Sequence, residues 1–160
     1  MAKAVVFFAE GTEECEALLV VDLLRRAKVE VLVASASGSR EILSSHKVHI
    51  TADALAEEVD YSDVDLVVLP GGIPGTPNLA ANKTVTDTCA AFAKAGKKVA
   101  AICAAPSVLA ALLYLVAIKE YNGVRFLSCI TCVNLLQICS LGFQATTLFQ
   151  GKQVFRYQLS

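Results

Sequence analysis

The stretch KKVAAICAAPSVLAALLYLVAI, residues 97–118, decides which fold this chain adopts. Its part from Val99 to Ile118 has twenty residues and no charge, and a helix that spans a membrane needs about 20 apolar residues. The same part carries Cys103 and, three residues later, Pro106. Proline suits the first turn of a helix and disrupts its interior. Pro106 therefore favours a buried strand that ends before Cys103, a turn and a new helix over one continuous membrane helix.

The residues upstream support that interpretation, because short apolar runs alternate with helical patterns. Strands are expected at 3–9, 29–34, 64–69 and 99–102, helices at 17–28 and 84–95, a hairpin at 42–51 and a short acidic helix at 55–59. Alternating strands and helices are typical of a parallel sheet with helices on both faces. The sequence thus predicts an α/β fold, and no membrane association is expected.

Composition places the first two-thirds of the chain among ordinary soluble domains, whereas the last 62 residues, 99–160, carry only 5 of the 29 charged residues and do not fit that class. Its 160 residues fit one domain, 1–160, with room for a sizeable core. The net charge of −1 gives no basic excess for nucleic acid or for an anionic membrane surface. The first apolar run is too short for a secretory signal and meets acidic residues at once. The six scattered cysteines are then expected to be cytoplasmic thiols and not a disulfide framework.

Cys103 lies where a nucleophile elbow would place its reactive side chain, between a strand and a helix. Ala101 and Ala105, two residues before and after it, are small enough for the strand and the helix to approach each other closely. A cysteine at a helix N-terminus faces free backbone N–H groups, here with Ala104 as a candidate, and such surroundings lower a thiol pKa from about 8.5 to roughly 3.5–7.5. The spacing alone is equally consistent with a buried structural cysteine.

Two further segments follow predicted strands, at the edge where open α/β sheets place their sites. The segment PGGIPG, residues 70–75, has glycines whose backbone N–H groups can face an oxyanion, although a plain turn would have the same composition. Glu13, Glu14 and Glu16 follow the first strand. One of these carboxyl groups could contact Cys103, whereas clustered acids in general are solvated.

Three motifs together resemble the ThiJ/PfpI superfamily, in particular its protein deglycase branch, over about residues 3–113. They are EGTEECE at 10–16, VVLPGGIPGTPNL at 67–79 and AAICAAPSVLA at 100–110. Three motifs in the right order are far more specific than any one of them. The resemblance implies a flavodoxin-like three-layer α/β sandwich with a mostly parallel sheet, usually assembled as a homodimer.

For the site, the resemblance implies that Cys103 is the nucleophile and the oxidation-sensing thiol. Glu16 would be a protonated carboxyl group that hydrogen-bonds the sulfur, since two adjacent negative charges repel. Gly72, with Gly71 beside it, would supply a backbone N–H near that sulfur. The implied chemistry uses no cofactor and no metal. Cys103 adds to a small reactive aldehyde such as methylglyoxal, or to a glycated adduct, and Glu16 moves a proton before hydrolysis releases a hydroxy acid.

A non-catalytic redox sensor or redox-regulated chaperone that uses the same cysteine is one alternative to the enzyme. An inactive, truncated relative is another. Loss of aldehyde turnover on substitution of Cys103 or Glu16 would favour the enzyme. Peroxide-selective oxidation without turnover would favour the sensor.

The chain departs from the superfamily pattern in residues 114–160, which form an atypical tail. Cys129, Cys132 and Cys139 favour buried thiols over a zinc site, because no histidine lies near them. The histidines, His46 and His49, have a spacing that puts them on opposite faces of a strand, which favours exposed side chains over metal ligation. An altered C-terminus would leave the sheet incomplete.

Overall fold

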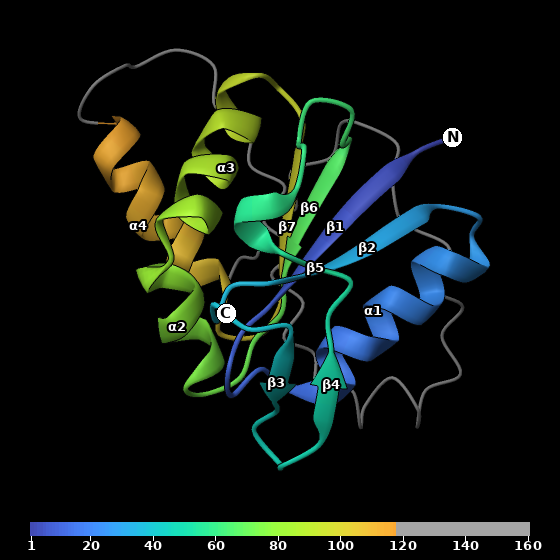
Figure 1. Cartoon of the computed structure of the whole chain (residues 1–160). Coiled ribbons are helices and arrows are strands. Elements are labelled where there is room, and N and C mark those ends of the chain that lie inside the picture. Colours follow the sequence, from blue (N-terminus) through green and yellow to red (C-terminus); the bar gives the residue numbers. More distant parts are fainter. Residues whose placement is uncertain (118–160) are drawn as a thin grey trace, which may run out of the picture.

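The computed structural model describes residues 1–117, with side chains described through residue 112, and its elements alternate along the chain as expected (Figure 1). The strands are β1 Lys3–Phe8, β2 Glu30–Ser35, β3 Glu41–Leu43, β4 His49–Thr51, β5 Ala54–Leu55, β6 Leu66–Leu69 and β7 Lys98–Ala101. The helices are α1 Glu14–Arg26, α2 Gly75–Ala81, α3 Lys83–Lys94, α4 Pro106–Ala117 and the short 3₁₀-helix η1 Ala56–Glu58. The predictions for the tail cysteines and the altered C-terminus lie outside the described residues.

Five of these strands form one parallel sheet in the order β5-β2-β1-β6-β7. The central strand β1 pairs with β2 on one side, where Val5 lies opposite Leu32, and with β6 on the other, where Val5 lies opposite Val67. The chain therefore extends the sheet from β1 first in one direction and then in the other, as flavodoxin-like sheets do. Strands β3 and β4 form a separate antiparallel hairpin, which confirms the predicted hairpin.

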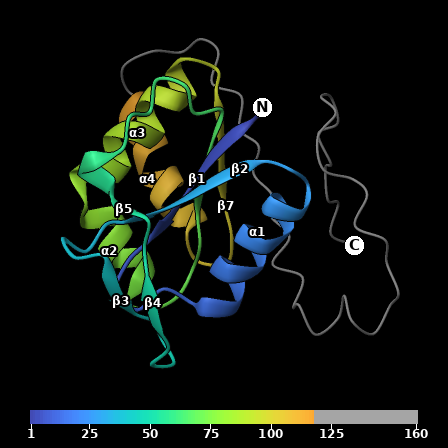
Figure 2. The same cartoon turned by 45° about the vertical axis from the view of Figure 1, so that its right-hand side comes forward.

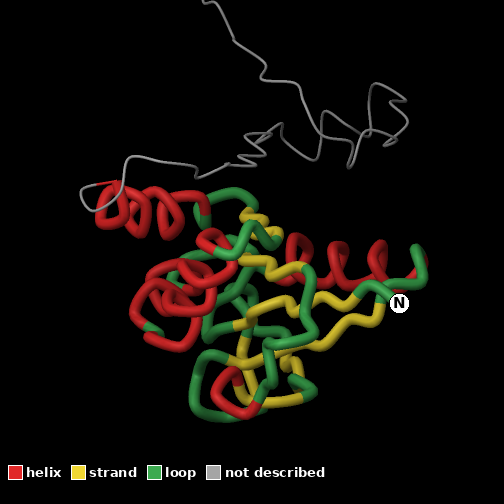
Figure 3. The backbone as a smooth tube through the Cα atoms, turned by 90° about the horizontal axis from the view of Figure 1, so that it is seen from above, coloured by secondary structure: helices red, strands yellow, loops and turns green. Residues whose placement is uncertain are grey.

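Successive side chains of β1 point into two different cores, one on each face of the sheet. Val5 and Phe7 pack among residues of α2, α3 and α4, whereas Val6 and Phe8 pack among residues of α1 and the β3–β4 hairpin. All four side chains are fully buried. The views in Figures 2 and 3 agree that α1 lies on one side of the sheet and α2 to α4 lie on the other. The predicted α/β sandwich is confirmed.

The chain from Lys98 to Ala117 divides into a strand, a turn and a helix, as predicted. Strand β7 ends at Ala101, a turn contains Cys103, and α4 begins at Pro106. The strand hydrogen-bonds to β6 and the helix contacts α2 and α3. Within the described residues, no helix is long and apolar enough to cross a membrane.

Helix α1 begins three residues before its predicted start because a glutamate caps it. The Glu13 carboxylate accepts a hydrogen bond of 2.7 Å from the N–H of Glu16, and this satisfies one of the free donors of the first turn. At the other end Lys28, with φ of 63°, has the left-handed conformation that terminates helices. Glu16 therefore belongs to a helix, whose rigid first turn fixes the direction of its side chain.

Helix α2 was not predicted, because the run of prolines and glycines before and within it indicates a turn. Its first turn nevertheless tolerates Pro77, since the N–H groups at the start of a helix have no partner inside the helix. The N–H of Asn78 donates to the carbonyl oxygen of Pro74 at 3.0 Å. Leu79 then anchors the helix by full burial in the core.

Candidate active site at the strand ends

The three motifs meet at the carboxyl end of the parallel sheet. Glu16 follows β1, Gly71 follows β6 and Cys103 follows β7. The chain leaves β1 toward β2 and returns to the other side of β1 with β6, so this end holds the switch point of the sheet. Open α/β sheets bind ligands in the crevice at such a point. The predicted site residues therefore lie where this fold class places its chemistry.

Cys103 occupies a strained elbow. Its φ is 58°, in the left-handed region that residues other than glycine rarely adopt, at a cost of roughly 1–3 kcal/mol. Before it, the N–H of Ile102 donates to the Leu69 carbonyl oxygen at 3.0 Å, and after it Ala105 is fully buried against the core. The cysteine itself is exposed. The thiol of Cys103 is thus exposed between two anchored residues, Ile102 and Ala105. The alternative of a buried structural cysteine is therefore wrong.

Gly71 is the point at which the glutamate and the cysteine come together. Its N–H donates a hydrogen bond of 3.1 Å to Oε2 of Glu16. A Cβ atom added to Gly71 would lie 2.5 Å from that oxygen, 2.7 Å from Cβ of Cys103 and 3.2 Å from the nitrogen of Ala104. Real Cβ atoms essentially never come within 3.0 Å of another atom, so any residue other than glycine would force the Glu16 carboxylate or the Cys103 side chain to move.

The neighbouring Gly72 holds two loops together. Its φ is 103°, and a Cβ atom there would collide with the backbone around Gly11 and Glu13. Two backbone hydrogen bonds of 3.0 Å, from Glu13 N–H to Gly71 and from Gly75 N–H to Gly11, lock the loops in this contact. The structure thus places Gly71 beside the carbon of the cysteine side chain and Gly72 against the acidic loop. The assignment of the Gly72 N–H to the sulfur stays a prediction.

The three acidic residues after β1 have different surroundings. Glu13 caps α1, Glu14 lies against the β3–β4 turn, and Glu16 faces Gly71. Partial burial opposes ionisation of Glu14, but hydrogen bonds from its own N–H and from the N–H of His46, with the imidazole charge, lower its pKa to about 2. Their spacing along the helix separates these carboxyl groups, so only Glu16 is available beside the elbow.

The other described cysteines have surroundings that suppress their reactivity. Cys15 is exposed on α1, but the negative charge of Glu13, then partial burial, raises the pKa of its thiol. Cys89 is buried in α3, and desolvation raises its pKa to about 12. Because the thiolate is the nucleophile, neither side chain competes well with a cysteine at an exposed helix N-terminus.

An apolar groove of about 460 Å³ begins beside the elbow, between α2 and α4. Ala104 lies in its lining together with Ile73 and Ala80 from the α2 side and Val108 and Ala111 from α4. Sequence reasoning missed this groove because it missed α2, which forms one of its walls. The groove thus provides an apolar surface beside the elbow.

The fold and the site define a class of protein: a parallel α/β sandwich with an exposed cysteine at a strand–helix elbow and a carboxyl group beside it. Within that class, the sequence profile of the DJ-1/PfpI family matches residues 2–119, and the chain belongs to this family.

Relatives with similar sequences and structures each match roughly two thirds of this chain. Protein DJ-1 homolog B of Arabidopsis thaliana is 39% identical over 101 residues, which are 63% of this chain and 23% of that protein. Protein dj-1beta of Drosophila melanogaster is 39% identical over 107 residues, 67% of this chain and 57% of that protein. The structure of oxidized Toxoplasma gondii DJ-1 matches with a TM-score of 0.68 at 35% identity, over 70% of this chain and 61% of that one. The chain thus spans less than two thirds of each of these relatives.

Proposed function

We propose that the protein is a cysteine-dependent glyoxalase or protein deglycase that acts on 2-oxoaldehydes such as methylglyoxal, or on their adducts, without a cofactor. The observation that carries this proposal is the convergence of Cys103 and Glu16 on Gly71. A nucleophile and a proton-transfer group within reach of one bound carbonyl compound are the parts this reaction needs. Membership of the DJ-1/PfpI family supports it.

The chemistry balances without an external oxidant or reductant. The sulfur of Cys103 adds to the aldehyde carbon and forms a hemithioacetal. Glu16 then moves a proton from that carbon to the neighbouring one, so the aldehyde carbon is oxidised to a thioester while the ketone is reduced to an alcohol. Water cleaves the thioester, which releases a 2-hydroxy acid and restores the thiolate. The apolar groove beside Ala104 offers contact for the methyl group of the substrate.

A named relative supports the same reaction class. The Caenorhabditis elegans protein called glutathione-independent glyoxalase DJR-1.2 is 31% identical to this chain over 102 residues, 64% of this chain and 54% of that protein. Its name describes an aldehyde reaction that does not use glutathione. A protein cysteine in place of the glutathione thiol is consistent with such a reaction.

Turnover of methylglyoxal to lactate in the absence of glutathione tests the proposal. Cys103→Ser should abolish turnover, and Glu16→Gln should lower kcat by about 10²–10⁴. Cys15→Ser is the matched control, because it removes an exposed thiol outside the elbow and should leave turnover unchanged. Circular dichroism confirms that each variant is folded. Turnover at the wild-type rate in Cys103→Ser would contradict the proposed enzymatic function. No turnover by the folded wild-type protein would contradict it as well.

Redox sensing through Cys103 is the second candidate function. It is supported by the exposure of this thiol beside Glu16 and by the Toxoplasma gondii relative, whose structure is of the oxidized protein. Stoichiometric peroxide would then oxidise Cys103 to a sulfenic or sulfinic acid, as mass spectrometry of the peptide can detect. Oxidation at Cys103 without aldehyde turnover would select this function over the enzyme.

A homodimer is part of the proposal. Three leucine side chains of α1 are exposed: 42% for Leu18, 40% for Leu19 and 54% for Leu23. A group of exposed apolar side chains on one helix indicates a contact surface. A second copy of the chain would cover this face. We also propose a cytoplasmic site of action, because six scattered cysteines in a chain of this size are expected to be thiols and not a disulfide framework.

A further inference from the structure

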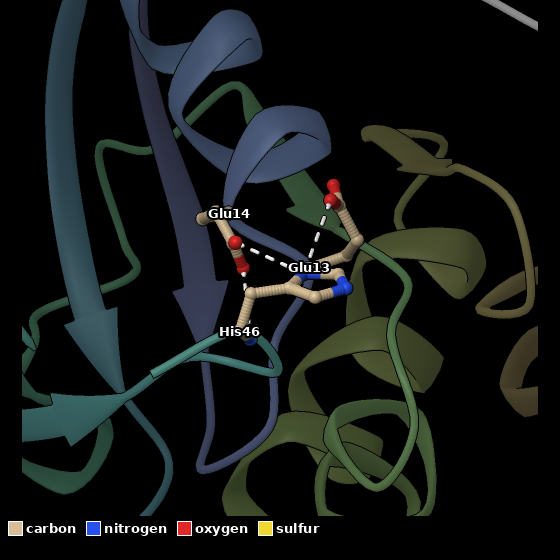
Figure 4. A group of neighbouring side chains, drawn as sticks. All are labelled: Glu13, Glu14 and His46. Carbon is tan, nitrogen blue, oxygen red and sulfur yellow. Dashed lines mark hydrogen bonds and ion pairs between the residues drawn. The ribbon is translucent and has the colours of Figure 1, made fainter. Parts of the chain in front are cut away.

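A histidine and two glutamates from distant parts of the chain meet outside the elbow. Nδ1 of His46, in the turn between β3 and β4, lies 2.9 Å from Oε1 of Glu14 and 4.0 Å from Oε1 of Glu13. One ligand atom from each of the three side chains falls within 4.8 Å of the other two. Figure 4 shows the imidazole ring facing the two carboxyl groups at the start of α1. None of these groups touches Gly71 in the way Glu16 does.

Each carboxylate is oriented by one of its two oxygens. Oε2 of Glu13 accepts the capping hydrogen bond from Glu16 N–H. Oε2 of Glu14 accepts from the Ser45 hydroxyl at 3.2 Å and from the N–H of His46 at 3.4 Å. In both residues the other oxygen, Oε1, is therefore the one that faces the imidazole. The Ser45 hydroxyl also lies 3.1 Å from Nδ1 of His46.

The β3–β4 turn is anchored independently of these side chains. The N–H of Ser45 donates to the carbonyl oxygen of Thr12 at 2.9 Å, and the N–H of Gly11 donates to the carbonyl oxygen of Leu43 at 2.9 Å. These backbone contacts hold the turn against the start of α1 in addition to the side-chain pairs. A preformed arrangement of ligand atoms lowers the cost of ordering them around an ion.

The charges in this group do not balance. The side chains of Glu13 and Glu14 are 24% and 13% exposed, and within residues 1–112 no lysine or arginine forms an ion pair with either. The basic group that faces both carboxylates is the imidazole of His46, which forms an ion pair with them only when it is protonated. With a neutral imidazole the group carries two negative charges, which the N-terminal dipole of α1 compensates only in part. A divalent cation would neutralise it.

We propose that Glu13, Glu14 and His46 bind a divalent transition-metal ion, with Zn²⁺ as the best match to one imidazole nitrogen and two carboxylate oxygens. Zinc lies about 2.0–2.2 Å from such ligands, so tetrahedral ligand atoms are about 3.3 Å apart. The distance from Nδ1 of His46 to Oε1 of Glu14, 2.9 Å, is below this value, and the distance to Oε1 of Glu13, 4.0 Å, is above it. Three protein ligands leave a fourth position for water. The ion would tie the β3–β4 turn to the helical turn that carries Glu16.

Zinc titration of the full-length chain, stripped of metal and kept reduced, tests the site by calorimetry. His46→Gln and Glu14→Gln should each weaken Zn²⁺ binding at least about tenfold. The matched control is His49→Gln, which removes the other histidine of the hairpin and should bind like the wild type. Both test substitutions keep a hydrogen-bonding side chain of similar size, and thermal unfolding without metal checks that each variant folds.

Cobalt substitution identifies the ligand atoms. Co²⁺ bound to this site should give visible d–d absorption without the intense near-ultraviolet band of a cobalt–thiolate bond. Zinc affinity that is unchanged in His46→Gln, or a thiolate band that disappears in Cys15→Ser or Cys103→Ser, would place the metal elsewhere and overturn the proposal. An absence of stoichiometric zinc binding would overturn it as well. These readouts are independent of aldehyde turnover.

Discussion

The N–H of Gly71 donates a hydrogen bond of 3.1 Å to Oε2 of Glu16 and thereby joins the end of β6 to the first turn of α1. The elbow residue Cys103 packs against the same glycine. The absence of a side chain at Gly71 is what allows a helix, a loop and an elbow to meet within the length of one side chain.

Gly71→Ala should disrupt the site. The added methyl group would lie 2.5 Å from the Glu16 carboxylate and 2.7 Å from Cβ of Cys103, so one of them must move. We expect at least about a tenfold loss of Cys103 alkylation rate and a decrease of about 1–3 kcal/mol in the free energy of unfolding. Gly38→Ala is the control: nothing lies near that position, so the variant should lose roughly 1 kcal/mol through its positive φ and keep its alkylation rate. Equal rates in Gly71→Ala and the wild type would contradict the geometry.

Acid should destabilise the protein partly through Glu14. Its pKa is lowered from 4.5 to about 2 in the folded state, so its contribution to stability is complete above about pH 4.5 and disappears as the pH falls toward 2. Urea unfolding of Glu14→Gln should therefore differ most from the wild type near neutral pH and converge with it at low pH. His46→Gln should change the free energy of unfolding in the same direction as Glu14→Gln, but by a smaller amount. A difference that grows as the pH falls would refute this assignment.

Cys15 should react more slowly than an ordinary exposed thiol, because the charge of Glu13 raises its pKa. In a Cys103→Ser background, Glu13→Gln should accelerate alkylation of Cys15 a few-fold near pH 8 while it keeps a capping oxygen for α1. Cys89 is the internal reference and should stay unmodified until denaturant is added, because it is buried. The rate at each cysteine is measured by peptide mass spectrometry. An unchanged rate at Cys15 would mean that the Glu13 charge has no influence on it.

The exposed leucines of α1 give a test of the homodimer. Leu23→Glu should shift the protein toward monomer in gel filtration, with little change in its thermal midpoint, because Leu23 is 54% exposed within the chain. Val48→Glu places the same charge on a similarly exposed residue, 43%, of the β3–β4 turn and should leave the elution volume unchanged. Identical elution of Leu23→Glu and the wild type would remove this face from the interface.

Local chemistry explains which features the sequence could predict. The elbow is encoded within a few residues: Ala101 and Ala105 allow close packing, and Pro106 marks the first turn of α4. The alternation of β1 between two cores likewise follows from its run of apolar side chains. Both patterns depend on neighbours in the chain, so they are readable before any tertiary contact is known.

The remaining features depend on contacts between distant segments. Glu16, Gly71 and Cys103 come from the ends of three different strands. No local sequence pattern indicates which of the three glutamates, Glu13, Glu14 or Glu16, faces the elbow. Residue spacing placed His46 on a strand, whereas it lies in the turn and reaches the start of α1. Helix α2 was missed because Pro77 within it and the prolines and glycines before it are typical of a turn, although burial of its apolar side stabilises a helix.

The most direct test of the central claim asks which thiol reacts first. The full-length protein is treated with one equivalent of iodoacetamide at about pH 6, where only a thiolate stabilised by surroundings such as the N-terminus of α4 reacts quickly. Intact-mass and peptide analysis then locate the adduct. We predict one rapid adduct on Cys103 that disappears in Cys103→Ser and persists in Cys15→Ser. Labelling spread over several cysteines, or none before denaturation, would contradict an assembled elbow and the function proposed for it.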